Sequence, residues 1–236
     1  MEYGRVEGIE KPVSRIGQGL VMVRTDQQDA ADALLDAVFE AGVTLYDTAQ
    51  IYGGGESDRS FGRWVRSRGV REKVVLLAKC CHFNRDRNRV TPYDIRADLH
   101  DTLARSGLDY VDLLVMHRDD PSVPVGPLVE TMNELIGEGL IRAYGGSNWA
   151  HERIAEANEY AAGRGMTGFA CSSPQFSLAE MVESPWPGCL TLSGPAHAEA
   201  RDWYAERQLP VVSWSSLAGG FFSGRWDRTS MEQADP

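Results

Sequence analysis

The sequence predicts a (β/α)8, or TIM, barrel, and three observations lead to that fold class. Apolar strand-like runs alternate with amphipathic helical segments about every thirty residues. The runs show little polar alternation, which is typical of parallel strands buried on both faces. The chain has 236 residues, 42% of them hydrophobic, enough for one sizeable core. We therefore expect residues 1–236 to form a single barrel domain.

Seven strands and six helices are predicted in alternation. The strands are expected at residues 16–23, 43–48, 73–80, 110–117, 141–147, 167–173 and 210–216. The helices are expected at residues 29–42, 57–66, 94–107, 127–139, 151–163 and 196–208. In the first helix the spacing predicts one buried face, made of Ala33, Leu34, Ala37, Val38 and Ala41. Gly42 is a typical helix C-cap.

The residues after 216 are polar and contain no eighth strand. A parallel barrel that lacks one strand leaves unpaired backbone groups along two strand edges. We therefore expect the chain to be C-terminally incomplete, without the eighth strand-helix unit.

The charge of the chain argues against two classes of partner. Lys and Arg total 24 and Asp and Glu total 34, so the formal net charge is -10. An acidic surface repels nucleic acid phosphates and anionic lipids at long range. No apolar run approaches the roughly 20 residues that span a bilayer, and the N-terminus has no uninterrupted apolar signal region. We expect a cytoplasmic protein that binds neither nucleic acid nor membranes.

The cysteines and most histidines do not form recognisable motifs. The four cysteines, none in a CxxC pair, are interpreted as reduced thiols of the core or rim; they are Cys80, Cys81, Cys171 and Cys189. Four of the histidines lack the close spacing of metal ligands, so no metal site is predicted; they are His82, His100, His151 and His197. The glycines at 53–55 lack GxGxxG spacing and are expected to form a turn into the next helix.

Residues suited to proton transfer follow three successive predicted strands. Asp47 and Tyr52 follow the second strand, and Lys79 and His117 end the third and fourth. Parallel strands would bring all four to one rim, where barrel enzymes carry their active sites. Lys79 needs a counter-ion, which Asp47 can supply, and its charge can acidify the Tyr52 phenol. Taken singly, each residue also fits a structural ion pair or a packed side chain; their shared position favours catalysis.

Several segments resemble the aldo-keto reductases, especially the bacterial branch related to potassium-channel β subunits. They are VTLYDTAQIYGGGESDRSFG, LLAKC, DYVDLLVMHRDDPSVPVGPLVETMNELIGEGLIRAYGGSNW and VVSWSSLAGGFFSGRW, spread over residues 12–226. The resemblance implies a barrel that binds NADP(H) without a Rossmann motif and reduces an aldehyde or ketone, the small-molecule carbonyl substrate, to an alcohol. It implies Tyr52 as proton donor, Lys79 and Asp47 as its tuners, and His117 as the group that orients the carbonyl.

The resemblance also implies cofactor contacts. Ser147 and Asn148 match the pair that holds the nicotinamide carboxamide, and Trp214 matches a ring that stacks on the nicotinamide. Backbone near the cofactor is expected at Gly19 and Leu20, and Asp47 is expected to contact it. The pyrophosphate contacts are expected at Ser215, Leu217, Gly219 and Arg225.

The chain departs from the family pattern at three places. Leu20 replaces a threonine and loses its hydroxyl. Ser173 stands where the family has glutamine, with Gln175 two residues later, so carboxamide recognition is looser or re-routed. The usual contacts to the adenosine 2′-phosphate lie beyond residue 236, so the preference for NADP over NAD comes from the family alone.

The substrate, the oligomeric state and two rival functions stay open from the sequence. Loop residues that could line the substrate pocket, or lie on the surface, are His82, Phe83, Asp119, Trp149 and Trp186. One rival is an NADP-binding sensor or interaction module without significant turnover. The other is a lyase or aldolase that uses Lys79 as a Schiff-base nucleophile.

Overall fold

The computed structural model describes residues 1–224, 226 and 227. Six strands pair in parallel in the order β3-β4-β5-β6-β7-β8, and they span Gly17–Gly19, Leu45–Asp47, Val75–Cys80, Val111–Met116, Ile141–Ser147 and Cys171–Ser173. The six α-helices of this part of the chain are α1 to α6, and they span Gln28–Glu40, Glu56–Arg68, Pro92–Ser106, Val125–Gly137, His151–Ala162 and Ala198–Arg207.

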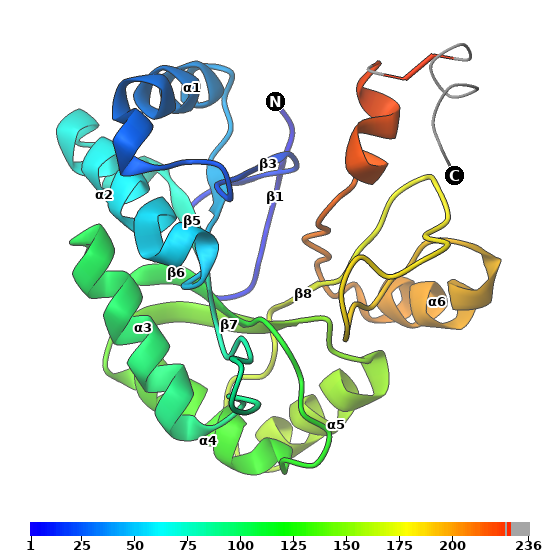
Figure 1. Ribbon diagram of the computed structural model, residues 1–236. Helices are drawn as coiled ribbons and strands as arrows, with labels where there is room; N and C mark the ends of the chain where they lie inside the picture. Colours follow the sequence, from blue (N-terminus) through cyan, green and yellow to red (C-terminus); the bar gives the residue numbers. More distant parts are fainter. Residues whose placement is uncertain (225, 228–236) are drawn as a thin grey trace.

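The sheet curls, and helices cover its outside (Figure 1). Each helix of α1 to α5 connects two neighbouring parallel strands, which is the repeating unit of the predicted fold. The arrangement is that of a partial (β/α)8 barrel, so the predicted fold class is confirmed.

Strand alternation sorts the side chains into two apolar clusters. One face of each strand packs under the helices, as Tyr46, Leu76 and Leu114 do. The other face points into the barrel and contributes Leu45, Val75, Leu77, Leu113 and Val115. Successive side chains of a strand point to opposite faces. Residues that lie two positions before or after one of these interior residues on the same strand therefore also point into the barrel.

A short N-terminal hairpin covers the amino end of the barrel. Strands β1 (Tyr3–Gly4) and β2 (Val13–Ser14) pair antiparallel, and the loop between them carries apolar side chains into the interior cluster. The residues that enter it from the hairpin are Val6, Ile9 and Val13. The amino end of the barrel interior is therefore packed with apolar side chains.

The predicted seventh strand forms only in part. Val211 and Trp214 make isolated parallel bridges to Ser172 and Gln175. Between these bridges lies Pro174, which has no N–H to donate and therefore interrupts a ladder of hydrogen bonds. The segment lies beside β8 as predicted, without becoming a regular strand.

The predicted buried face of the first helix is wrong except at Val38. In α1 the buried residues are Ala31 and Leu35, whereas Leu34 is 46% exposed. Val38 and Phe39 pack against the core beside them. Alanines 33, 37 and 41 gave the expected face its apolar character, but burying Leu35 and Phe39 removes more apolar area from water.

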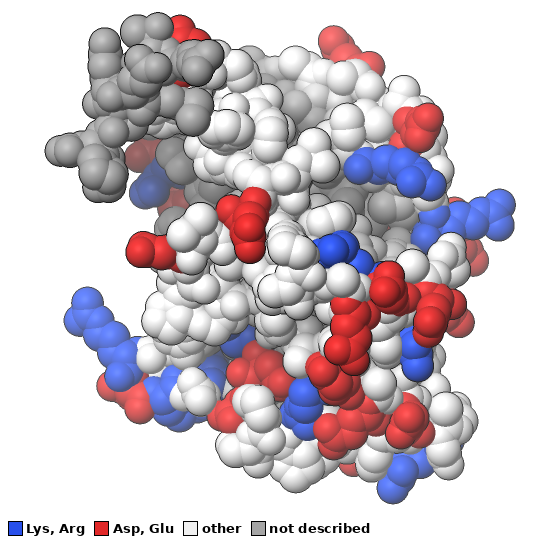
Figure 2. Space-filling model, turned by 90° about the vertical axis from the view of Figure 1, so that its right-hand side faces the viewer, with Lys and Arg blue, Asp and Glu red and all other residues white. Residues whose placement is uncertain are grey.

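The surface carries charges of both signs. Figure 2 shows a face on which acidic side chains gather, with basic side chains scattered among them. In the described part of the chain, the longest and most apolar helices fall short of what a membrane crossing requires.

Candidate active site

Three of the predicted catalytic residues enter the barrel interior by strand alternation. Asp47 follows Leu45 by two residues, Lys79 follows Leu77 by two, and His117 follows Val115 by two. The apolar residues lie in the interior cluster, so the polar ones continue the same inward face one step nearer the carboxyl ends. The sequence therefore places these three side chains together at the top of a packed interior.

Lys79 is the centre of this group. Its side chain is 2% exposed, and its Nζ donates hydrogen bonds to Asp47 Oδ1, to Tyr52 Oη at 3.2 Å and to Thr48 O at 3.3 Å. Burial by itself lowers the pKa of the ammonium, but the Asp47 charge and the hydrogen bonds outweigh burial, so the pKa of Lys79 is raised. The ammonium is therefore charged over the whole neutral range.

Tyr52 reaches Lys79 from a tight turn after β4. Tyr52 N donates to Ala49 O at 2.9 Å, and a 3₁₀ turn over Tyr52–Gly55 leads into α2. Gly53, Gly54 and Gly55 have φ of +57°, +65° and +90°, a region that favours glycine. The three glycines thus form the predicted turn. The turn places the Tyr52 hydroxyl beside Lys79 at the carboxyl ends of the strands.

Hydrogen bonds to the neighbouring helices stabilise the chain just before this turn. Thr48 Oγ1 donates to Asp58 Oδ1 at 2.8 Å, and Arg105 Nη1 donates to Gln50 O at 3.1 Å. Burial raises the pKa of Asp58 to about 6, although hydrogen bonds from Thr48 and Thr102 oppose the shift. Both contacts tie the backbone on either side of the rim to helices α2 and α3.

His117 lies beside the phenol. Its ring centroid is 6.1 Å from that of Tyr52 and 4.8 Å from that of His82, with edge-to-face geometry in both pairs. The side chain is 8% exposed, and burial, with the charges of Lys79 and of Arg118, lowers the pKa of His117 well below its ordinary value. The imidazole is therefore neutral at pH 7 and can donate one hydrogen bond.

The predicted carboxamide pair lies at the end of β7, joined to β8. Ser147 Oγ donates to Ser173 O at 2.8 Å, and Asn148 Nδ2 donates to Ser147 Oγ at 3.1 Å and to His117 O at 3.3 Å. Asn148 Oδ1 accepts from Leu190 N at 3.1 Å. The two side chains are thus already hydrogen-bonded within the protein, and they position the end of β6.

Ser173 differs from its neighbours. It is 1% exposed, and its Oγ has no hydrogen-bond partner within the described residues. A buried polar atom without a partner costs free energy, which marks this hydroxyl as one that a ligand could satisfy. Gln175 does not replace it, because the Gln175 amide holds the following loop by accepting from Thr191 Oγ1 and Ser193 Oγ.

Trp214 forms the other side of this region together with Trp186. The two rings stack at 5.2 Å between centroids and 23° between planes, so one face of Trp214 is already covered. The indole N–H of Trp214 is buried and has no hydrogen-bond partner in the described part of the chain. Trp186, one of the residues proposed to line the pocket, therefore does lie next to a predicted cofactor residue.

The remaining predicted cofactor residues lie on exposed backbone or in the core. Ser215, Leu217 and Gly219 are exposed, and a Cβ on Gly219 would have open space around it. Gly19 is exposed with open space as well, whereas Leu20 is fully buried under the helices and its carbonyl accepts from Ser57 Oγ at 2.8 Å. Arg225 lies outside the described residues.

The predicted pocket residues divide into two groups. His82 and Phe83 lie by the rim, with His82 against His117. Trp149 is 1% exposed, packs on Phe169 and donates to Arg118 O at 3.1 Å, so the alternative of a surface residue is wrong for it. Asp119 is bound to Arg153 at 3.1 Å.

Arg118 is a buried charged residue beside His117 that was not predicted. The side chain is 7% exposed, its Nη1 donates to His117 O at 3.1 Å, and its Nε is buried without a partner in the described residues. Burial lowers the pKa of Arg118. Its position directly after His117, at the end of a buried strand, was the signal that could have identified it.

Comparisons with known proteins identify the family of the chain. The model of the Aldo/keto reductase family matches residues 15–235. A probable voltage-gated potassium channel subunit beta of Oryza sativa subsp. japonica is 29% identical over 233 residues, which cover 96% of this chain and 67% of that protein. The aldo-keto reductase YhdN of Bacillus subtilis (strain 168) is 32% identical over 170 residues, 65% of this chain and 49% of that protein.

A solved structure supports the fold. The glycerol dehydrogenase AKR11B4 of Gluconobacter oxydans superposes with a TM-score of 0.76 at 22% identity, covering 98% of this chain and 68% of the other. The chain thus spans from about half to about two thirds of the length of these proteins. The family match covers nearly all of the sequence, and the chain therefore belongs to the aldo/keto reductase family.

Proposed function

We propose that this protein reduces an aldehyde or ketone to an alcohol with NADPH, with Tyr52 as the proton donor. The observation that carries the proposal is the hydrogen bond from the buried Lys79 ammonium to Tyr52 Oη, with Asp47 as the counter-ion. Because the phenol oxygen accepts this bond, its own O–H remains free to donate to a substrate. Family membership supports the same reaction class.

The charge at Lys79 has a direct chemical consequence. When Tyr52 gives up its proton, a phenolate forms 3.2 Å from a fixed ammonium. A nearby cation stabilises the charged form of an acid, so the proton leaves more readily. Asp47 keeps Lys79 charged, and the low exposure of the pair limits screening by water.

His117 is proposed to orient the carbonyl oxygen. Its neutral imidazole stands beside the Tyr52 ring and can donate one hydrogen bond to the same oxygen that receives the phenol proton. Two donors aimed at one oxygen stabilise the negative charge that develops there. The rim thus supplies a proton, a second donor and a fixed cation.

The residues around the rim fit a nicotinamide cofactor. When bound, NADPH supplies the hydride. We propose that Ser147, Asn148 and Ser173 hold its carboxamide, where Ser173 Oγ has no partner in the described residues. We propose Trp214 as the ring that stacks on the nicotinamide. The exposed backbone at Gly19 and at residues 215–219 would hold the rest of the cofactor.

The test is Tyr52→Phe, which removes only the hydroxyl. General acid catalysis contributes about a hundredfold or more to rate, so we expect carbonyl reduction to fall by at least that factor. NADPH affinity, measured by fluorescence quenching, should stay within about twofold, because the proposed cofactor contacts are elsewhere. Aldehyde turnover near the wild-type rate in this variant would show that Tyr52 is not the acid.

A second candidate function rests on the potassium-channel relative. In that case the chain would bind NADPH as a sensor or interaction module and turn over little substrate. Wild-type protein that quenches with NADPH but reduces none of a broad panel of aldehydes and ketones would favour this function over the reductase.

The structure offers less support for a Schiff-base lyase. A lysine nucleophile must lose its proton, whereas the pKa of Lys79 is raised by Asp47 despite burial. Borohydride in the presence of a carbonyl substrate should therefore leave Lys79 unmodified, and a covalent adduct on Lys79 would contradict both this argument and the role assigned to its charge.

A further inference from the structure

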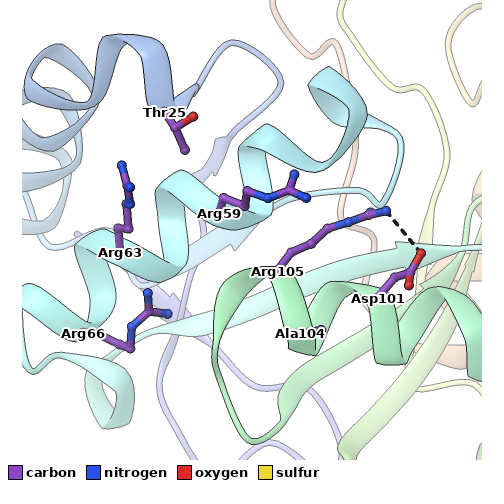
Figure 3. Close-up of a pocket in the computed structure, with 7 residues that line it drawn as sticks. All are labelled: Thr25, Arg59, Arg63, Arg66, Asp101, Ala104 and Arg105. Carbon is purple, nitrogen blue, oxygen red and sulfur yellow. Dashed lines mark hydrogen bonds and ion pairs between the residues drawn. The ribbon is translucent and has the colours of Figure 1, made fainter.

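A group of arginines on the outside of the barrel has no part in the proposed reaction. Between α2 and α3 lies a surface cavity of about 570 Å³ (Figure 3). Four of its seven lining residues are arginines: Arg59, Arg63 and Arg66 from α2, and Arg105 from α3. The cavity also includes Thr25, Asp101 and Ala104. We call these seven residues the arginine cavity.

Close helix packing brings these charges together. A Cβ on Gly62 would lie only 2.0 Å from Ser106 O, so this position of α2 admits no side chain. The approach of α3 to Gly62 sets Arg105 against the arginines of α2, which follow each other at spacings of four and three residues on one helix face. Like charges at these spacings destabilise a helix, so the arrangement costs free energy unless an anion offsets it.

Protein carboxylates neutralise only part of this charge. Arg59 pairs with Glu56 at 3.4 Å, and Arg105 pairs with Asp101 at 3.2 Å. Arg63 and Arg66 have no carboxylate partner within the described residues, and Arg66 donates only to the carbonyl of Ser106. Arginine stays protonated at any pH of interest. At least two positive charges of the cavity are therefore unpaired in a chain whose net charge is -10.

We propose that the arginine cavity binds a compact polyanion that carries phosphate groups. A guanidinium group can donate two parallel hydrogen bonds to two oxygens of one phosphate. Four guanidinium groups around one cavity therefore suit a chain of two or three phosphates better than a single phosphate. The ligand is then either a free polyphosphate or the phosphate end of a nucleotide. This site is separate from the proposed cofactor site, since none of its residues is among the proposed cofactor contacts.

The experiment is a calorimetric titration with tripolyphosphate and, in parallel, with ATP and adenosine. The variant is Arg59→Gln with Arg63→Gln, because both side chains are exposed and neither touches the turn that carries Tyr52. The matched control is Arg164→Gln with Arg207→Gln, which removes the same two charges from exposed positions outside the cavity. Arg105 is left unchanged because it donates to Gln50 O behind that turn.

We expect the wild type and the control to bind tripolyphosphate equally and the double variant to bind at least about tenfold more weakly, since it lacks two guanidinium groups that would donate charge-assisted hydrogen bonds to phosphate. Equal affinity for ATP and tripolyphosphate identifies the phosphate chain as the ligand, whereas tighter binding of ATP identifies a nucleotide. Arg63→Lys alone should keep part of the affinity.

Three results would overturn the proposal: no binding of tripolyphosphate to the wild type, equal binding by the double variant, or binding of adenosine as tight as that of ATP. Thermal unfolding checks that the double variant is folded. Its NADPH quenching should match the wild type, so a failure at the arginine cavity is distinguishable from a failure at the proposed cofactor site.

Discussion

The two ends of the barrel each bring a lysine, an aspartate and a tyrosine into contact. At the carboxyl ends of the strands, Lys79 contacts Asp47 and Tyr52. At the amino ends, Lys11 Nζ lies 2.8 Å from Asp112 Oδ1 and 3.0 Å from the hydroxyl of Tyr110. The same three residue types therefore occur in two places, and only one of them is proposed to be reactive.

The difference lies in the remaining partners. Arg71 also pairs with Asp112 at 2.8 Å, and the Tyr110 hydroxyl donates a hydrogen bond to Glu72, whose two carboxylate oxygens both lie 3.2 Å away. At the rim, among the residues that the structure describes, the Tyr52 hydroxyl is hydrogen-bonded to Lys79 alone. A satisfied group stabilises the fold, whereas a hydroxyl that keeps its proton free is available for chemistry.

The largest effect is expected when each lysine is replaced by methionine. Lys79→Met removes the cation proposed to stabilise the charge left on Tyr52 when its proton is transferred, so kcat should fall about a thousandfold. Lys11→Met, its matched control, should leave kcat within about twofold because Lys11 lies at the packed end. Steady-state kinetics with one aldehyde measures both. A comparable loss of kcat in the two variants would abolish the distinction between the ends.

The next effect concerns stability at the packed end. Lys11→Met leaves the buried Asp112 with Arg71 as its remaining cation. Breaking a buried pair without such a second cation costs about 3–5 kcal/mol, so we expect the free energy of unfolding to drop by about 2 kcal/mol, measured by urea denaturation. An unchanged urea midpoint would mean that this pair is not structural.

A smaller contrast separates two serines at the rim. Ser147→Ala removes a donor to Ser173 O and a partner of Asn148, which should lower the free energy of unfolding by about 1 kcal/mol. Ser173→Ala removes a hydroxyl without a partner in the described residues and should not lower stability. NADPH should bind several-fold more weakly to the Ser173 variant. If Ser173→Ala lowered the free energy of unfolding and left NADPH affinity unchanged, Ser173 would be a structural residue and not a cofactor contact.

The smallest effect is a pH dependence at His117. Because the pKa of His117 is lowered in the folded state, the unfolded chain takes up a proton near pH 6.5 that the folded chain does not. Stability from the neutral imidazole is thus fully present above that pH and is lost as the pH falls below it. His117→Gln should therefore lose less unfolding free energy than the wild type between about pH 6.5 and 5.

A second variant for this pH effect is His82→Gln. Burial lowers the pKa of His82 in the same direction, and His82 also contributes to the lowered pKa of His117, so this variant should reduce the acid sensitivity too. Parallel stability curves for His117→Gln and the wild type would show that His117 titrates in the folded protein as it does in the unfolded chain.

Much of the fold could be predicted where strands are long and regular. The predicted strands at 73–80, 110–117 and 141–147 correspond to β5, β6 and β7. Their apolar runs also predicted that Lys79 and His117 would meet at one rim. The prediction was weakest where local pattern and packing disagree, as in α1, whose alanine-rich face points outward.

Contacts made after β8 could not be predicted. The loop at 191–193 uses the amide of Gln175. Trp149 could lie in a pocket or on the surface by its sequence position, and the structure buries it against Phe169. Such outcomes depend on how a loop returns to the sheet, and spacing along the chain does not encode that path.

The sequence by itself determined the order of strands and helices and the glycine turn that carries Tyr52. It also determined the alternation along the strands that points Asp47, Lys79 and His117 inward. It could do so because alternation along a strand and the φ preference of glycine are local properties. The tertiary structure alone decided which polar groups are left without partners, because hydrogen-bond satisfaction depends on neighbours from distant parts of the chain. That distinction separates Tyr52 from Tyr110 and is the basis of the ligand sites proposed at Ser173 Oγ and at the charges of Arg63 and Arg66.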